Sequence, residues 1–266
     1  LDGLPMNSLM VYTNGIISLV SLGMALLKKR SLKATPIQFI QSVLMGTVGM
    51  LITAVLLNTA YLYLPVGMAN MLNFLYPSVV CIVMGTVFKQ GFTKLQLGAI
   101  VCSIAGMIFL AGKGGDVNTL GIVCALVSAF TYGGYLIANE KGPANDLPIE
   151  TKLFYVSLPG TVLFGILAPL TGTLAAPAQP SGWLYVLASG LFTVGGYFLM
   201  MYGISLLGAS TSAFVSMLEP IVSVVFGTIW FGDPVTVGVA VGGLLVLSSI
   251  LLIAIDGSKK AKAAGE

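Results

Sequence analysis

The sequence has no histidine and very few charged residues. Of its 266 residues, 8% are charged and 57% are hydrophobic, and the mean hydropathy is +1.00. In soluble domains, charged residues make up roughly a quarter of the chain. Without histidine, zinc sites of the usual kinds, Ser-His-Asp triads and histidine proton relays are excluded. The composition predicts an all-α polytopic membrane protein that uses no metal ion and no cofactor.

Cysteine is also scarce, and a phosphate-binding loop is missing. Cys81, Cys102 and Cys124 lie in apolar stretches without CxxC spacing, so we interpret them as small hydrophobic residues and not as a disulfide or metal set. The glycine-rich run 111–115 lacks the Ser or Thr and the upstream glycine of a phosphate-binding loop, so we interpret it as an ordinary loop. At roughly 20 residues per membrane span, the length leaves no room for an extramembrane catalytic or nucleic-acid-binding domain.

Apolar runs between charged residues or Gly and Pro breaks predict nine membrane-spanning helices. They are expected at about 8–27, 36–57, 66–88, 95–111, 119–138, 151–170, 183–204, 210–231 and 235–255. If successive spans cross the membrane in alternating directions, all Lys and Arg residues except Lys113 lie on one side of the membrane. Because basic loops are retained in the cytoplasm, we expect a multi-pass protein of the cell membrane with a cytoplasmic basic tail, 259–266.

An internal repeat relates the two halves of the chain, because matching residues are separated by the same 143 positions. Leu4, Pro5 and Tyr12 match Leu147, Pro148 and Tyr155, and Leu75, Pro77, Val79, Phe88 and Thr93 match Leu218, Pro220, Val222, Phe231 and Thr236. The second repeat, 113–258, opens with the span 119–138, whose partner in the first repeat, 1–112, would lie upstream of Leu1. We therefore expect two five-helix repeats with nine of ten helices visible. Since five is an odd number, the repeats are expected to be inverted in the membrane.

These anchors resemble the drug/metabolite transporter superfamily and, within it, the EamA-type exporters. The resemblance is carried by 218–222, 231–236 and Gly238, and more weakly by 75–77, Thr93, Gly98 and Gly106. It implies two five-helix repeats and the export of small metabolites. The acidic residue that the family usually carries at the end of the fourth span of each repeat is Asp233 in the second half. It is missing from 89–91 in the first half.

Glu219 is the one acidic residue expected deep inside a span. Nine residues into the span 210–231, it would lie roughly 14 Å into a hydrocarbon core about 30 Å thick. An ionised carboxylate there costs at least about 2.5–3.5 kcal/mol. Glu219 must therefore face a wet cavity, carry a proton or find a partner. We weigh a role in contacting substrate or a coupling proton against a packing role.

Prolines are expected to kink two equivalent spans. Pro220 cannot donate a backbone hydrogen bond, so we expect it to free the carbonyl oxygen of Ser216. The repeat places Pro77 at the equivalent position of the first half. The two kinks are expected to bring polar side chains together at the membrane midplane. Alternatively, asparagines in such spans form hydrogen bonds that only hold neighbouring helices together. The predicted substrate-binding residues are Asn70, Asn73, Tyr76, Ser216 and Glu219, with Thr193 and Tyr197 from a polar stripe of 183–204.

The pattern favours a secondary active transporter that exports a small organic metabolite by alternating access. Proton coupling through Glu219 or an exchange mechanism would supply the energy. The absence of Lys and Arg from mid-span positions favours amino acids, amines or other neutral and cationic metabolites over sugar phosphates. A passive channel or a structural membrane protein is the alternative, whereas an intramembrane enzyme would need a second acid or a general base. The expected partners are the metabolite and the bilayer, with no nucleic acid.

Small residues predict close helix contacts in the last span of each repeat. The spacings Gly238-xxx-Gly242 and Cys102-xxx-Gly106 are typical of such contacts. They fit packing within one chain and packing across a homodimer equally well.

Overall fold

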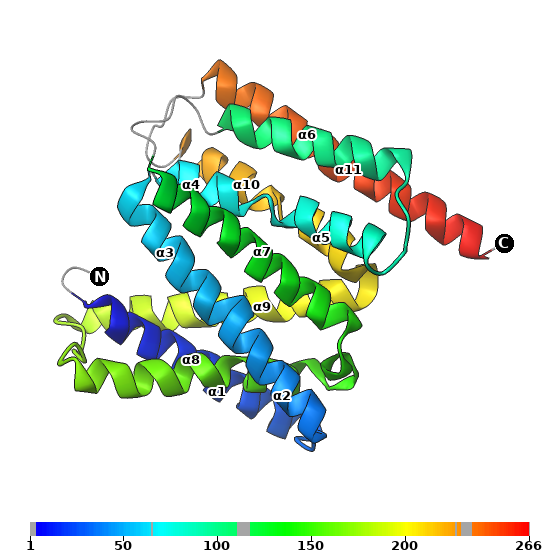
Figure 1. Cartoon of the computed structure of the whole chain (residues 1–266). Coiled ribbons are helices and arrows are strands. Elements are labelled where there is room, and N and C mark those ends of the chain that lie inside the picture. The colour runs from blue at the N-terminus through cyan, green and yellow to red at the C-terminus, as the bar shows by residue number, and fades with distance from the viewer. Residues whose placement is uncertain (1–3, 65, 111–117, 227, 230–235, 266) are drawn as a thin grey trace. The chain divides into compact units, whose positions relative to one another are not determined.

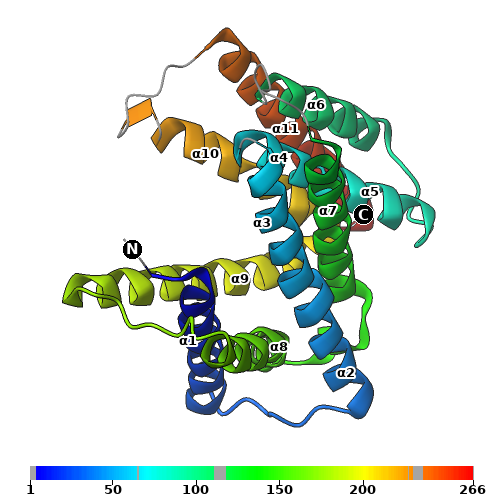
Figure 2. The ribbon, with the colours of Figure 1, turned by 60° about the vertical axis from the view of Figure 1, so that its left-hand side comes forward.

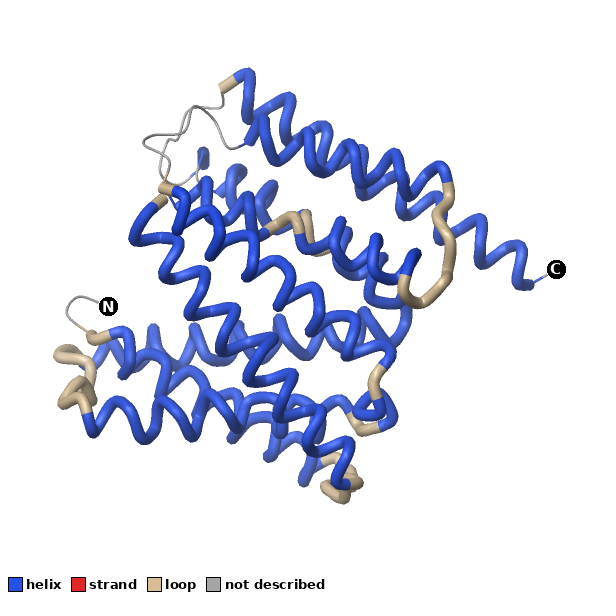
Figure 3. Tube along the Cα trace, in the orientation of Figure 1, coloured by secondary structure: helices blue, strands red, loops and turns tan. Residues whose placement is uncertain are grey.

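The computed structural model describes residues 4–64, 66–110, 118–226, 228–229 and 236–265. These residues form helices and loops and contain no strand (Figure 3). Among them, seven helices are long and apolar enough to cross a membrane, and one further apolar helix, Lys94–Phe109, is shorter. The structure confirms the all-helical, multi-pass class, while the count of nine spans and the inverted repeat remain predictions. The glycine-rich run 111–115 and Asp233 lie outside the described residues.

The chain divides into two compact units, and each takes residues from both halves of the sequence. Unit 1 consists of Leu1–Leu51 and Ala138–Leu206, and unit 2 consists of Ile52–Ile137 and Leu207–Glu266. The units therefore do not follow the order of the two predicted repeats along the chain.

Unit 1 contains two long helices that lie side by side, α1 and α8 (Figures 1 and 2). Its elements are α1 (Met6–Leu27), α2 (Pro36–Leu44), most of the π-helix η1 (Met45–Ile52), the 3₁₀-helix η2 (Pro143–Asp146), α8 (Ile149–Leu170) and the first part of α9 (Pro180–Val215). Helix α2 begins with a capping box, in which Thr35 and Gln38 each accept a hydrogen bond from the other's backbone N–H.

Hydroxyl groups and small residues bring α1 and α8 together. The Ser18 hydroxyl lies 2.7 Å from the Ser157 hydroxyl and 2.8 Å from the Thr161 hydroxyl. All three oxygens are thereby paired inside an apolar environment, where an unpaired hydroxyl is costly. Gly160 leaves room for the Asn14 side chain, which a Cβ atom at Gly160 would approach to 2.4 Å.

Unit 2 contains a second pair of neighbouring helices, α6 and α11 (Figure 1). Its elements are α3 (Thr53–Tyr63), α4 (Val66–Asn73), α5 (Tyr76–Thr86), α6 (Lys94–Leu110), α7 (Thr119–Lys141) up to Ile137, the end of α9, α10 (Leu218–Phe226) and α11 (Val237–Gly265). Cys81 and Cys124 are buried in its apolar clusters as expected, and Cys102 is half-buried.

Glycines account for the close approach of α6 and α11. A Cβ atom at Gly106 would lie 2.8 Å from Val246 Cγ2 and 3.0 Å from the Gly242 carbonyl oxygen, and one at Gly238 would lie 3.2 Å from the Phe109 carbonyl oxygen. The small-residue spacing noted in the sequence is thus used for packing within one chain.

Several helix limits differ from the predicted spans. The span predicted at 66–88 is broken between α4 and α5, and the span predicted at 210–231 is broken between α9 and α10. The non-helical Gly208, with φ 79° and ψ 165°, divides α9 into two helical segments, in agreement with the gap between the predicted spans 183–204 and 210–231. Pro77 and Pro220 lie in the first turns of α5 and α10, where a missing N–H removes no helical hydrogen bond. At both prolines the structure therefore has a break between two helices, in place of the expected kink within one helix. Helix α11 also extends through Gly265, so the predicted tail 259–266 is helical as far as it is described.

Large apolar side chains cover much of the outer surface. Leu27 is 85% exposed, Phe192 is 82% exposed and Leu170 is 80% exposed. A soluble monomer does not expose apolar surface on this scale. The hydrocarbon chains of a bilayer are the environment that these side chains fit.

Candidate functional site

The turns that precede α5 and α10 are held by backbone hydrogen bonds. Phe74 N–H donates to the Asn70 carbonyl at 2.8 Å, and Met217 N–H donates to the Phe214 carbonyl at 3.1 Å. The Ser216 carbonyl, which we expected Pro220 to leave free, accepts a hydrogen bond from Glu219 N–H at 3.0 Å. That expectation was wrong, because the helix breaks at this point and a tighter turn satisfies the carbonyl group.

Tyr76 and Ser216, two of the predicted site residues, are in direct contact. Their hydroxyl groups share a short hydrogen bond. Ser216 Oγ also donates to the Ala213 carbonyl oxygen at 2.7 Å. Because a serine hydroxyl carries one hydrogen, Tyr76 is the donor in the shared bond. The start of α5 and the turn before α10 are thus joined by a buried phenol, since Tyr76 is 3% exposed.

Glu219 lies in the first turn of α10, with an exposed side chain. Its carboxyl group interacts electrostatically with the hydroxyl groups of Tyr61 and Tyr76. Within the part of the chain that the structure describes, this carboxyl group has neither an ion pair nor a hydrogen bond. An accessible carboxylate can hold a proton or an ammonium group.

The two asparagines of α4 each pair with a residue that sequence patterns did not select. Tyr61 Oη donates to Asn70 Oδ1 at 2.5 Å, and Asn73 Nδ2 donates to Ser128 Oγ at 2.8 Å. Tyr61 comes from α3 and Ser128 from α7, so only tertiary packing brings them to α4. No spacing rule in the sequence marks Tyr61 or Ser128.

Aromatic rings line the same region. The Tyr76 and Tyr132 rings meet edge to face with centroids 4.7 Å apart, and Tyr132 stacks on Tyr135 at 5.8 Å. The centroid of the Phe74 ring lies 6.1 Å from that of Tyr76. These rings provide faces that can attract a cation as well as apolar surface.

Thr193 and Tyr197 lie in the part of α9 that belongs to unit 1, whereas the other five predicted residues belong to unit 2. The Thr193 hydroxyl donates to the carbonyl of Ser189 one turn earlier at 2.8 Å. The Tyr197 side chain is half-buried. For these two residues a role in binding stays a prediction.

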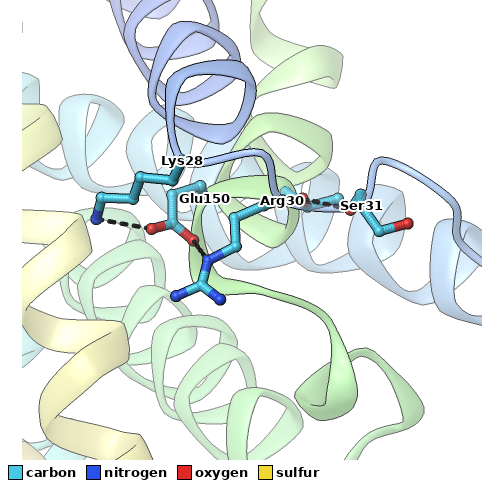
Figure 4. A network of polar contacts seen from close by, with 5 residues as sticks. Lys28, Arg30, Ser31 and Glu150 are labelled. Atoms are coloured by element: carbon cyan, nitrogen blue, oxygen red, sulfur yellow. Dashed lines mark hydrogen bonds and ion pairs between the residues drawn. The ribbon is translucent and has the colours of Figure 1, made fainter.

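Unit 1 has a polar cluster that the sequence analysis did not select (Figure 4). The Glu150 carboxylate lies 2.9 Å from Lys28 Nζ and 4.0 Å from Arg30 Nε, and its side chain is only 5% exposed. Thr151 Oγ1 donates to the Ser31 carbonyl at 2.9 Å. Together these contacts fasten the loop after α1 to the first turn of α8. Their position in the sequence, at span ends, gave no reason to connect them.

A pocket of about 170 Å³ lies elsewhere in unit 1, at the start of α9. Its lining includes Pro177, Gln179, Ser181 and Tyr185 and none of the predicted site residues. Within the described residues, no group of three or more Cys, Asp or Glu side chains could hold a metal ion.

The EamA-like transporter family matches residues 1–112 and 119–255. The chain belongs to this family. The resemblance inferred from the repeat anchors is thereby confirmed, and the chain stands among transporters and not among enzymes.

Individual relatives are distant members of the same group. An uncharacterized transporter of Synechocystis sp. is 27% identical over 77% of this chain and 63% of its own length, so the match covers less than two thirds of that protein. A protein of Streptantibioticus cattleyicolor, named "Probable terminal-alkyne amino-acid exporter", is 26% identical over 79% of this chain and 71% of its own length. One crystal structure superposes on 97% of this chain and 90% of its own, with a TM-score of 0.78 and 16% identity, a likeness that shows the fold alone.

Proposed function

We infer that this chain is a secondary active transporter of the cytoplasmic membrane that exports a small organic metabolite by alternating access. The observation that carries this inference is the accessible Glu219 carboxyl group in the first turn of a predominantly apolar helix, where it interacts electrostatically with Tyr61 and Tyr76. A carboxylate in such surroundings is costly unless it binds something. Membership in a transporter family supports the same conclusion.

Packing between equivalent helices supports the inverted repeat on which alternating access depends. Ser18 and Thr161 are 143 positions apart, the offset of the repeat, and their hydroxyl oxygens lie 2.8 Å apart. Two equivalent residues that touch each other lie next to the axis that relates them. This contact favours a twofold relation between α1 and α8, as expected for inverted repeats.

The proposed substrate class is an amino acid or an amine. The five site residues in unit 2 offer amides, hydroxyls, aromatic rings and one acid, and none of them is Lys or Arg. A protonated amine would satisfy the Glu219 carboxylate and could lie against the rings of Tyr76 and Tyr132. The amino-acid exporter among the relatives is consistent with this class.

Proton coupling would follow from the same carboxyl group. Glu219 would bind a proton when it faces one side of the membrane and release it when substrate or the other side replaces that proton. The basic residues of the predicted loops, all but Lys113 on one side, favour a cytoplasmic C-terminus.

Transport in proteoliposomes tests the proposal. A gradient of one pH unit can drive up to about a tenfold accumulation per coupled proton. We expect the wild type to accumulate labelled amino acid or amine and Glu219→Gln to lose the dependence on the gradient, while Glu140→Gln keeps it. Gradient dependence that survives in Glu219→Gln would exclude the coupling role, and flux that neither saturates nor supports counterflow would identify a passive channel.

A further inference from the structure

The two asparagine side chains of α4 are oriented by different partners. The hydroxyl hydrogen of each partner determines which end of the asparagine amide faces that partner. Ser128 Oγ donates its one hydrogen to the Ala125 carbonyl at 2.6 Å, so toward Asn73 it can only accept. The group that Asn73 turns to Ser128 is therefore its NH₂, at 2.8 Å. Its carbonyl oxygen Oδ1 points away from Ser128, because the two ends of an amide face in different directions.

Asn70 is held the opposite way round. The Tyr61 hydroxyl donates to Asn70 Oδ1 at 2.5 Å, which leaves Asn70 Nδ2 as the outward group. Neither Asn70 Nδ2 nor Asn73 Oδ1 has a hydrogen bond within the described part of unit 2. Both side chains are partly exposed.

The unpaired ends lie on one face of the helix. Residues three apart in a helix have Cβ atoms about 5–6 Å apart on the same side. Helix α4 thus presents one free donor, Asn70 Nδ2, next to one free acceptor, Asn73 Oδ1. Unpaired amide groups are costly against lipid, so a polar ligand or water must meet them.

We propose that Tyr61 and Ser128 are positioning residues that fix Asn70 as a donor and Asn73 as an acceptor for one ligand. The ligand carries a carboxylate, which Asn70 binds, close to an ammonium group, which Asn73 binds. The Glu219 carboxylate interacts electrostatically with Tyr61 and Tyr76, so the region of the site also contains a negative group that attracts the ammonium group. This inference rests on the proposed transport function and assigns its polar recognition to two amides with opposite roles.

Three transport substrates test the donor, Asn70, and the acceptor, Asn73, separately. L-leucine carries both groups, isoamylamine lacks the carboxylate, and 4-methylpentanoate lacks the amine. Loss of one oriented hydrogen bond is worth about a tenfold change in affinity. We expect Tyr61→Phe to raise the KM for leucine about tenfold and to leave the KM for isoamylamine within about twofold. Ser128→Ala should raise the KM for leucine and isoamylamine but not for 4-methylpentanoate.

A third variant is expected to reverse the preference between two probes, a result that partial unfolding would not produce. Asn70→Asp replaces the donor by a carboxylate, so it should repel the leucine carboxylate and favour isoamylamine over leucine by at least about tenfold relative to wild type. Tyr63→Phe, on the same helix as Tyr61 but with a 42% exposed side chain, is the matched control and should change neither KM.

The outcomes distinguish this inference from the transport function. Equal changes for all probes, or no change, in Tyr61→Phe and Asn70→Asp would overturn the donor and acceptor assignment while transport stands. Absence of saturable flux of every probe in the wild type would overturn the ligand class and the proposed function together.

Discussion

A methyl group added at Gly46 would meet the backbone of a neighbouring helix. Gly46 lies in η1 against the main chain of α8, where a Cβ atom would lie 2.0 Å from the Val156 carbonyl oxygen and 2.9 Å from its carbonyl carbon. Favourable contacts of carbon lie at about 3.5–4.0 Å, so the two backbones would have to separate by about 1–1.5 Å. Neither atom is the flexible end of a side chain.

Gly46→Ala is therefore expected to destabilise the protein. Forced separation in a well-packed interface costs about 1–3 kcal/mol, and a clash with backbone belongs at the upper end. The better helix propensity of alanine offsets up to about 1 kcal/mol, which leaves a net loss of about 2 kcal/mol. At about 2–4 °C per kcal/mol for a chain of this size, thermal unfolding in detergent should begin about 4–8 °C lower.

Gly165→Ala provides the matched control. Gly165 lies in α8, the helix that Gly46 faces, and a Cβ atom there would meet no atom within 4 Å. Its unfolding temperature should stay the same or rise slightly. If Gly46→Ala and Gly165→Ala unfold at the same temperature, the close contact between η1 and α8 does not exist as described.

Two further substitutions test other parts of the structure. Glu150→Gln keeps the shape of the side chain but loses the charge-assisted bond to Lys28 Nζ at 2.9 Å. Because Lys28 is half-exposed, we expect the free energy of unfolding to fall by about 1–2 kcal/mol. An unchanged unfolding temperature would argue against this ion pair. Gly208→Ala forces alanine into φ 79° and ψ 165°, a region restricted to glycine, and should cost about 1–3 kcal/mol. An unchanged unfolding temperature in Gly208→Ala would contradict this backbone geometry.

Properties that depend on composition and periodicity could be predicted from the sequence. Long apolar runs fix where helices lie, so α1, α7 and α8 begin and end within two or three residues of the predicted spans 8–27, 119–138 and 151–170. Where a helix breaks was harder to predict. Pro77 and Pro220 marked the right places, but a proline is equally compatible with a kink and with the first turn of a new helix.

The contacts of the candidate site show a similar division. The repeat selected Tyr76 and Ser216, and the structure joins them. Tyr61 and Ser128 could not be selected, because a tyrosine and a serine in apolar helices look the same whether they face lipid, another helix or an asparagine. Which residues of α3 and α7 meet α4 depends on helix packing, which no single-sequence pattern encodes.

The interleaving of the two units has a consequence for how the protein is made. Helix α1 ends at Leu27, whereas α8, against which it packs, begins at Ile149. At 5–20 residues per second, α8 is synthesised roughly 6–24 s after α1. During that time Ser18 must remain in the bilayer without Ser157 and Thr161. Unit 1 therefore cannot close until most of the chain has been inserted, and a chain cut between the two repeats would yield two fragments, neither of which contains a complete unit.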